Sequence, residues 1–100
     1  MVVTSYQNLK VWQSGMELTK SVYLLSQHFP KHELYGLTSQ MRRAAVSVPA
    51  NIAEGHARDS TKEFLHHISI ALGSLAELET LLALAKDLGY CDAAGTVELL

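Results

Sequence analysis

The sequence predicts an all-α protein, an antiparallel up-and-down bundle of four helices in a single domain, residues 1–100. Apolar residues recur at steps of three and four, whereas no segment keeps the alternation of a β-strand between turn residues. Helix breakers fall between the apolar segments, at Pro30, Gly55 and Gly89. These observations place helices at residues 9–27, 36–55, 61–88 and 93–100, the last of them short.

The first expected helix, residues 9–27, begins after Asn8 as N-cap and ends before Phe29-Pro30. Its apolar residues form two neighbouring stripes, although one stripe would cover one core. We therefore expect the helix to contact two neighbours, or one neighbour and a second subunit. The stripes are Leu9/Trp12/Met16/Tyr23 and Val11/Leu18/Val22/Leu25.

The second expected helix, residues 36–55, ends at Glu54-Gly55, with Gly55 closing its last turn. Pro49 inside the apolar pattern predicts a kink, and a break at Val48 is the alternative because residues before proline avoid the α region. A polar stripe opposite the apolar face is interpreted as a seam between subunits. A solvated face and a surface for a ligand such as phosphate are the alternatives. The stripe comprises Gln40, Arg43, Ser47, Asn51 and Glu54.

The third expected helix, residues 61–88, begins with Ser60 and Glu63 at the spacing of a capping box. A heptad seam runs along it: Phe64, Ile68, Ala71, Leu75, Leu78, Leu82 and Ala85. Its second half is apolar on almost every side, which predicts an oligomer interface that includes Leu81, Leu82, Leu84 and Leu88. Gly73 costs about 1 kcal/mol relative to alanine inside a helix, so we expect another helix to approach closely there.

The sequence lacks the spacing that catalysis or metal binding needs. His66 and His67 are adjacent and point about 100° apart on a helix, while Phe29-Pro30 interrupts the helix between His28 and His32. Gly73-Ser74-Leu75 has neither the second glycine nor the preceding strand of a nucleophile elbow. We expect no catalytic residue, no metal and no cofactor, and therefore a protein that is not an enzyme.

Charge is distributed unevenly along the chain, whose net charge is −2. Residues 1–50 carry five basic and two acidic side chains, and residues 51–100 carry three basic and eight acidic ones. A free-standing nucleic-acid-binding domain is usually more basic. This asymmetry is consistent with one positive face, or with docking of one subunit on the next. The candidates for phosphate contact are Arg42, Arg43, Arg58 and Lys62.

Three features bear on the compartment. The N-terminal residues lack the basic and apolar regions of a signal peptide, and no uninterrupted apolar run reaches about 18 residues. The single cysteine, Cys91, has no partner for an internal disulfide, which fits a reducing compartment. We expect a cytoplasmic protein without a membrane segment.

The segment Tyr35–Gly55, followed by Ser60, Glu63-Phe64 and the segment Gly73–Glu79, resembles the four-helix-bundle proteins, or 23S rRNA intervening-sequence proteins. The resemblance extends from about Leu9 to Tyr90 and implies antiparallel bundles that assemble into rings, commonly homopentamers. Some members of that family are encoded within insertions in large-subunit ribosomal RNA genes. A relative, the accessory variability determinant of diversity-generating retroelements, is similar, and it forms a basic pentamer that binds nucleic acid and a reverse transcriptase.

The resemblance implies a non-enzymatic, ring-forming protein that binds RNA or a nucleic-acid-handling protein. In that interpretation Arg42, Arg43, Arg58 and Lys62 occupy the family's basic positions. Its recurrent polar positions are occupied by Ser47, Asn51, Glu54, Ser60 and Glu77. The alternative is a purely structural scaffold that binds itself and an unknown protein partner. A pentamer of these chains would carry a net charge of about −10, which favours the alternative.

Overall fold

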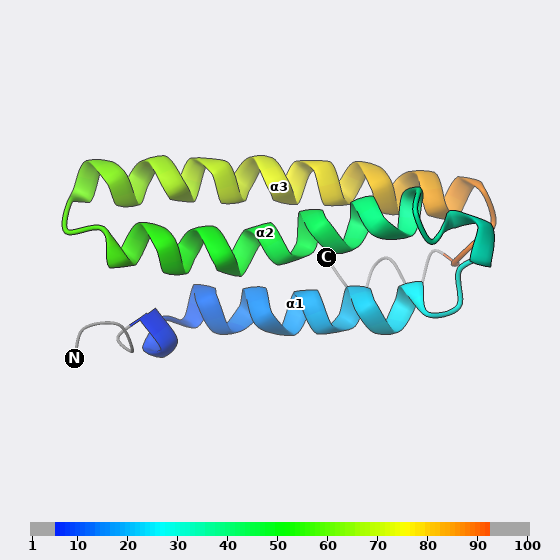
Figure 1. Cartoon of the computed structure of the whole chain (residues 1–100), viewed down its shortest axis with the longest axis horizontal. Helices are drawn as coiled ribbons and strands as arrows, with labels where there is room; N and C mark the ends of the chain where they lie inside the picture. Colours follow the sequence, from blue (N-terminus) through cyan, green and yellow to red (C-terminus); the bar gives the residue numbers. More distant parts are fainter. Residues whose placement is uncertain (1–5, 93–100) are drawn as a thin grey trace.

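The computed structural model describes residues 6–92, which form three α-helices and a short 3₁₀ helix between the first two. The elements are α1 (Lys10–Ser26), η2 (Lys31–Glu33), α2 (Leu37–Ala57) and α3 (Thr61–Asp87). Figure 1 shows α2 between α1 and α3 and antiparallel to both. The all-α, antiparallel prediction is confirmed for these three helices. The predicted fourth helix, residues 93–100, lies outside the described residues, and assembly into a ring stays a prediction.

Three predicted helix ends can be compared with the structure. The N-cap of α1 is Leu9 and not Asn8, because Tyr6–Asn8 already form a 3₁₀ turn whose Tyr6 carbonyl accepts from the Leu9 amide at 3.0 Å. At the start of α3, Ser60 caps the helix as predicted, since its Oγ accepts from the Glu63 amide at 3.3 Å. Gly89 follows α3 with a φ of 80°, the left-handed conformation in which glycine commonly ends a helix.

Gly55 has a different role from the one predicted. It lies inside the last turn of α2, which continues to Ala57. A Cβ atom at position 55 would lie only 2.6 Å from Cβ of His67 on α3. Glycine is therefore required there because the two helices approach closely, and not because the chain turns.

Pro49 lies within a continuous α2, so the alternative of a break at Val48 is wrong. Proline has no N–H, which leaves the carbonyl of Ala45 without its usual partner inside the helix. Thr19 of α1 supplies a donor: its Oγ1 lies 3.0 Å from the Ala45 oxygen and 2.8 Å from the Gly15 oxygen. Next to it, a Cβ atom at Gly15 would lie 3.3 Å from Cβ and Cδ of Pro49. Glycine thus lets α1 approach α2 where proline interrupts the hydrogen bonds.

The core consists of two clusters of buried apolar side chains along the bundle. The larger cluster includes Val22 of α1, Met41 of α2 and Leu82 of α3, and the smaller one comprises Val48, Ile52 and Ala71. Every residue of the predicted heptad seam on α3 is buried or half-buried, so that prediction is confirmed. The two predicted apolar stripes of α1 are only partly buried, since Val11 and Tyr23 are exposed.

The predicted oligomer-interface residues divide into two pairs. Leu81 and Leu82 are only 6% and 1% exposed because they belong to the core of this chain. This burial corrects their assignment to a contact between subunits. Leu84 and Leu88 are 48% and 57% exposed and remain candidates. The sequence pattern identified the apolar half of α3 but did not show which sides α2 and α1 cover.

By length and composition α3 is apolar enough to cross a membrane, although it contains no uninterrupted apolar run of about 18 residues. In the 18-residue segment of α3 that is apolar enough, 28% of the residues are buried within the chain. Core helices of bundles have similar compositions, and α3 packs against α2 at both Gly55 and Leu82. We therefore describe α3 as a helix of the bundle.

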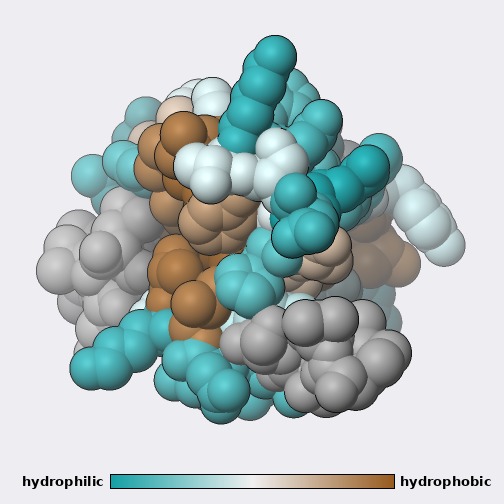
Figure 2. Space-filling view, turned by 90° about the vertical axis from the view of Figure 1, so that its left-hand side faces the viewer, coloured by the Kyte–Doolittle hydropathy of each residue, from teal (hydrophilic) through white to brown (hydrophobic). Residues whose placement is uncertain are grey.

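Between α1 and α3 a groove of about 440 Å³ runs over α2. Its lining is mostly apolar and includes Val11, Leu18, Val48 and Leu75. In a four-helix bundle the fourth helix covers this position. Figure 2, viewed from the end where α2 passes to α3, shows apolar side chains that reach the surface on one side of the bundle.

Glu33 joins three parts of the chain at the opposite end of the bundle. Its Oε1 accepts from the amide of Leu37, the first residue of α2, at 3.1 Å, and its Oε2 accepts from the hydroxyl of Tyr90, after α3, at 2.9 Å. The bond from Leu37, followed by that from Tyr90, lowers the pKa of Glu33 below its ordinary 4.5. The bond to Glu33 raises the pKa of Tyr90 above 10.0. The ring of Phe29 packs against that of Tyr90, with centroids 5.6 Å apart.

The contact between Thr19 and Ala45 makes a testable prediction. Thr19→Val keeps the shape of the side chain but leaves the Ala45 carbonyl without a donor, so the free energy of unfolding should fall by about 1–3 kcal/mol. Urea denaturation followed by circular dichroism measures this change. Thr61→Val is the matched control, because exposed Thr61 makes no side-chain hydrogen bond to a described residue. Equal losses in the two variants would contradict the role given to Thr19.

Candidate functional site

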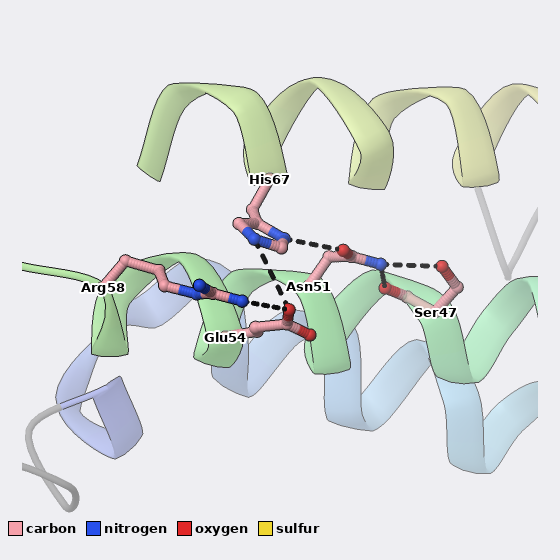
Figure 3. Close-up of polar contacts among 5 residues, drawn as sticks. All are labelled: Ser47, Asn51, Glu54, Arg58 and His67. Carbon is pink, nitrogen blue, oxygen red and sulfur yellow. Dashed lines mark hydrogen bonds and ion pairs between the residues drawn. The ribbon is translucent and has the colours of Figure 1, made fainter. Parts of the chain in front are cut away.

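A row of hydrogen-bonded polar side chains lies along the contact between α2 and α3. It comprises Ser47, Asn51 and Glu54 of α2 with His67 and Ser74 of α3, and we name it the polar seam. The steps within each helix are three, four or seven residues, so each set lies on one face. Figure 3 shows His67 reaching from α3 towards the three residues of α2.

Asn51 is the centre of the polar seam. Its Nδ2 donates to the carbonyl oxygen of Ser47 at 2.8 Å and to Ser47 Oγ at 2.9 Å. Its Oδ1 lies 3.0 Å from Nδ1 of His67, and since that oxygen can only accept, His67 carries a hydrogen on Nδ1. Ser74 Oγ donates to Ser47 Oγ at 2.8 Å. Four side chains are therefore connected across the two helices.

The seam ends in charged groups near the loop between α2 and α3. Glu54 Oε2 lies 3.5 Å from Nε2 of His67 and 3.2 Å from Nη2 of Arg58 (Figure 3). A neutral His67 donates only to Asn51, whereas a protonated one would donate to Glu54 as well. The side chains of Glu54 and Arg58 are both more than half exposed, so their ion pair contributes little to stability. The seam therefore does not depend mainly on this ion pair for its stability.

The predicted polar stripe divides at Ser47. Ser47, Asn51 and Glu54 contact α3 of the same chain, which corrects the interpretation of these three as a seam between subunits. Gln40 and Arg43 lie beyond the last hydrogen bond, where they line a cavity of about 370 Å³ between α2 and α3. The remaining lining residues are Ala44, Ser47, Ser74 and Glu77.

The four basic candidates do not form one patch. Arg42 packs on α1: its Nε donates to Ser26 Oγ at 2.9 Å, and its guanidinium carbon lies 4.7 Å from the ring centroid of Tyr23. Arg43 lines the cavity on the side of α3. Arg58 lies about 22 Å further along the bundle from Arg43, given 1.5 Å per residue of α2, and Lys62 follows it at the start of α3. Only this last pair is exposed near the same loop.

Two residues of the seam, His67 and Ser74, were not predicted as partners of the polar stripe. His67 was considered for metal binding, and Ser74 for catalysis or, with Gly73, for close helix packing. Sequence spacing within one helix does not reveal which residue of another helix it contacts. Among residues 6–92 no three His, Cys, Asp or Glu side chains are placed to hold a metal ion. Ser74 has its hydroxyl bonded to Ser47, and no imidazole contacts it among the described residues.

Comparison with known families places the chain. The family of 23S rRNA-intervening sequence proteins matches it over residues 7–100. The chain belongs to this family. The resemblance based on the segments Tyr35–Gly55 and Gly73–Glu79 is thereby confirmed. No curated protein matches the sequence significantly.

In this 23S rRNA-intervening sequence protein we predict that Asn51 and His67 stabilise the fold jointly. Asn51→Ala removes the partner of His67 and one donor to Ser47, so it should lower the free energy of unfolding by about 1–3 kcal/mol. A double-mutant cycle with His67→Ala should give a coupling energy of about 0.5–3 kcal/mol. Both quantities come from urea denaturation. His28→Ala, exposed after α1 and remote from the seam in sequence, is the control and should change stability little. A coupling energy near zero would contradict this role of the seam.

Proposed function

We propose that this protein is a non-enzymatic assembly protein whose copies join edge to edge into a ring. The observation that carries the proposal is the outward surface of α3. Its outermost row consists of small exposed residues at steps of four and three, Ser69, Gly73, Ala76 and Thr80. Exposed large apolar side chains flank the row: Leu65, Ile70, Leu72, Leu84 and Leu88. Extended apolar surfaces of this kind mark sites of association.

Gly73 supports a close approach from outside the chain. A Cβ atom at this position would have no neighbour within 4 Å among residues 6–92, so the approach expected from the sequence does not come from these residues. Glycine costs about 1 kcal/mol here relative to alanine. A helix of a second copy, packed on the row of small residues, accounts for that cost because small side chains let two helix backbones approach.

The partner surface in this proposal is the outward side of α1. It exposes Tyr23 and Leu24, and α1 and α3 lie on either side of α2 (Figure 1). α1 carries two basic and one acidic side chain, whereas α3 carries four acidic and two basic ones. Contact between two different surfaces repeats from copy to copy and closes into a ring when the rotation allows it. A homopentamer is the ring size that the family resemblance implies.

The assembly makes a direct prediction about mass in solution. Leu72, 62% exposed, can be replaced by glutamate without disturbing the core, so Leu72→Glu should give a folded monomer where the wild type gives a ring. Light scattering coupled to gel filtration measures the mass, and circular dichroism checks folding. Leu34→Glu, on the exposed segment before α2, is the matched control and should leave the ring intact. A monomeric wild type, or an unchanged mass in Leu72→Glu, would contradict the proposal.

RNA binding is a second candidate function, favoured by the exposed pair Arg58 and Lys62. The pair flanks the start of α3, where free backbone amides favour an anion. A ring would repeat it once per subunit, so a modest local charge would act several times on one RNA. The neighbouring carboxylates of Glu54 and Glu63 oppose this function, as does the net charge of −2.

The RNA-binding function is tested with RNA transcribed from a 23S ribosomal RNA insertion. Fluorescence anisotropy at low and high salt should show binding that weakens steeply with salt, because phosphate contacts release counterions. The double variant Arg58→Ala/Lys62→Ala should lower the affinity and the salt dependence while the particle mass stays unchanged. Lys20→Ala, on exposed α1, is the control. Absence of binding at low salt, or equal binding by the double variant, would contradict the RNA-binding function. Assembly would then remain as the proposed function.

A further inference from the structure

The cavity at the end of the polar seam carries polar side chains without partners. Gln40, Arg43 and Glu77 line it, and among residues 6–92 none of the three makes a hydrogen bond or ion pair. Elsewhere on the same stripe, Ser47 accepts a hydrogen bond from Ser74 of α3, and Asn51 bonds to His67 of α3. These three polar side chains thus face one hollow between the two helices.

The floor of the cavity is made of small residues. Ala44 is buried and Ser47 and Ser74 are half-buried, so no bulky side chain fills the space of about 370 Å³. Ser47 Oγ already accepts hydrogen bonds from Asn51 and from Ser74, and its own hydrogen has no acceptor among the described residues. This hydroxyl is therefore a donor held in place by the seam.

The charges at the rim select the kind of ligand. Arg43 and Glu77 face the cavity from different helices, and no nitrogen–oxygen pair between them lies within 4.0 Å. An anion alone would be repelled by Glu77, and a cation alone by Arg43. A molecule with both charges gains a charge-assisted contact at each end. The volume is within the usual range for small-molecule sites, about 300–1,000 Å³.

We propose that this cavity binds a small zwitterion of the free amino-acid type. Its carboxylate contacts Arg43, with Gln40 and the Ser47 hydroxyl as further donors, and its ammonium group contacts Glu77. The binding site lies within one chain, so the proposal does not depend on assembly into a ring.

Isothermal titration calorimetry of the full chain with individual free L-amino acids tests the proposal. We expect at least one of them to bind with a stoichiometry of one per chain. Arg43→Gln and Glu77→Gln should each weaken binding by about 10- to 100-fold, the loss of one charge-assisted contact. N-acetylation of the ligand, which removes its ammonium charge, should have an effect like that of Glu77→Gln.

Glu79→Gln is the matched control, since Glu79 is also exposed on α3 but lines the groove towards α1. It should leave the affinity unchanged. Three results would overturn the proposal: no heat with any amino acid at millimolar concentration, equal binding of the acetylated forms, or binding that survives in both cavity variants. If no amino acid binds and Arg43→Gln changes the particle mass, the proposal is also overturned. The cavity would then hold a side chain of a second copy.

Discussion

The close contact between Gly15 and Pro49 fixes where α1 crosses α2, and the rest of the arrangement depends on it. Proline leaves the Ala45 carbonyl without a donor in its own helix, Thr19 supplies one from α1, and the lack of a side chain at Gly15 lets α1 pack closely on Pro49. On the other side, Gly55 makes room for His67, so that α3 approaches closely enough to bond with Asn51. Both contacts rest on α2, which leaves the outward sides of α1 and α3 exposed.

The polar seam positions α3 and also shapes the cavity beyond it. A buried polar group without a partner is costly, so hydrogen bonds among Ser47, Asn51 and His67 favour one register of the two helices. The same small side chains that permit the seam leave a hollow between Arg43 and Glu77. Fixed hydrogen bonds and an unfilled space therefore lie side by side.

Much of the fold follows from periodicity within single helices. The heptad seam of α3 and the cap at Ser60 were predicted because each depends on residues close in sequence. Gly55 and Leu82 were misinterpreted because their roles are set by other helices: α3 packs on Gly55, and α2 and α1 cover Leu82. The polar stripe identified the face that carries Asn51 but not its partner, since His67 lies sixteen residues away on another helix. Tertiary contacts of this kind leave no periodic pattern.

The central functional claim is that the outward side of α1 contacts the outward side of α3 in a second copy. Thiol cross-linking tests it in a Cys91→Ser background, where no native thiol remains. Leu24→Cys and Leu72→Cys chains are unfolded, mixed, refolded and treated with a short thiol cross-linker. Linked dimers should form in the mixture and in neither separate sample. Dimers in the separate Leu72→Cys sample, or none in the mixture, would contradict a contact between these two surfaces.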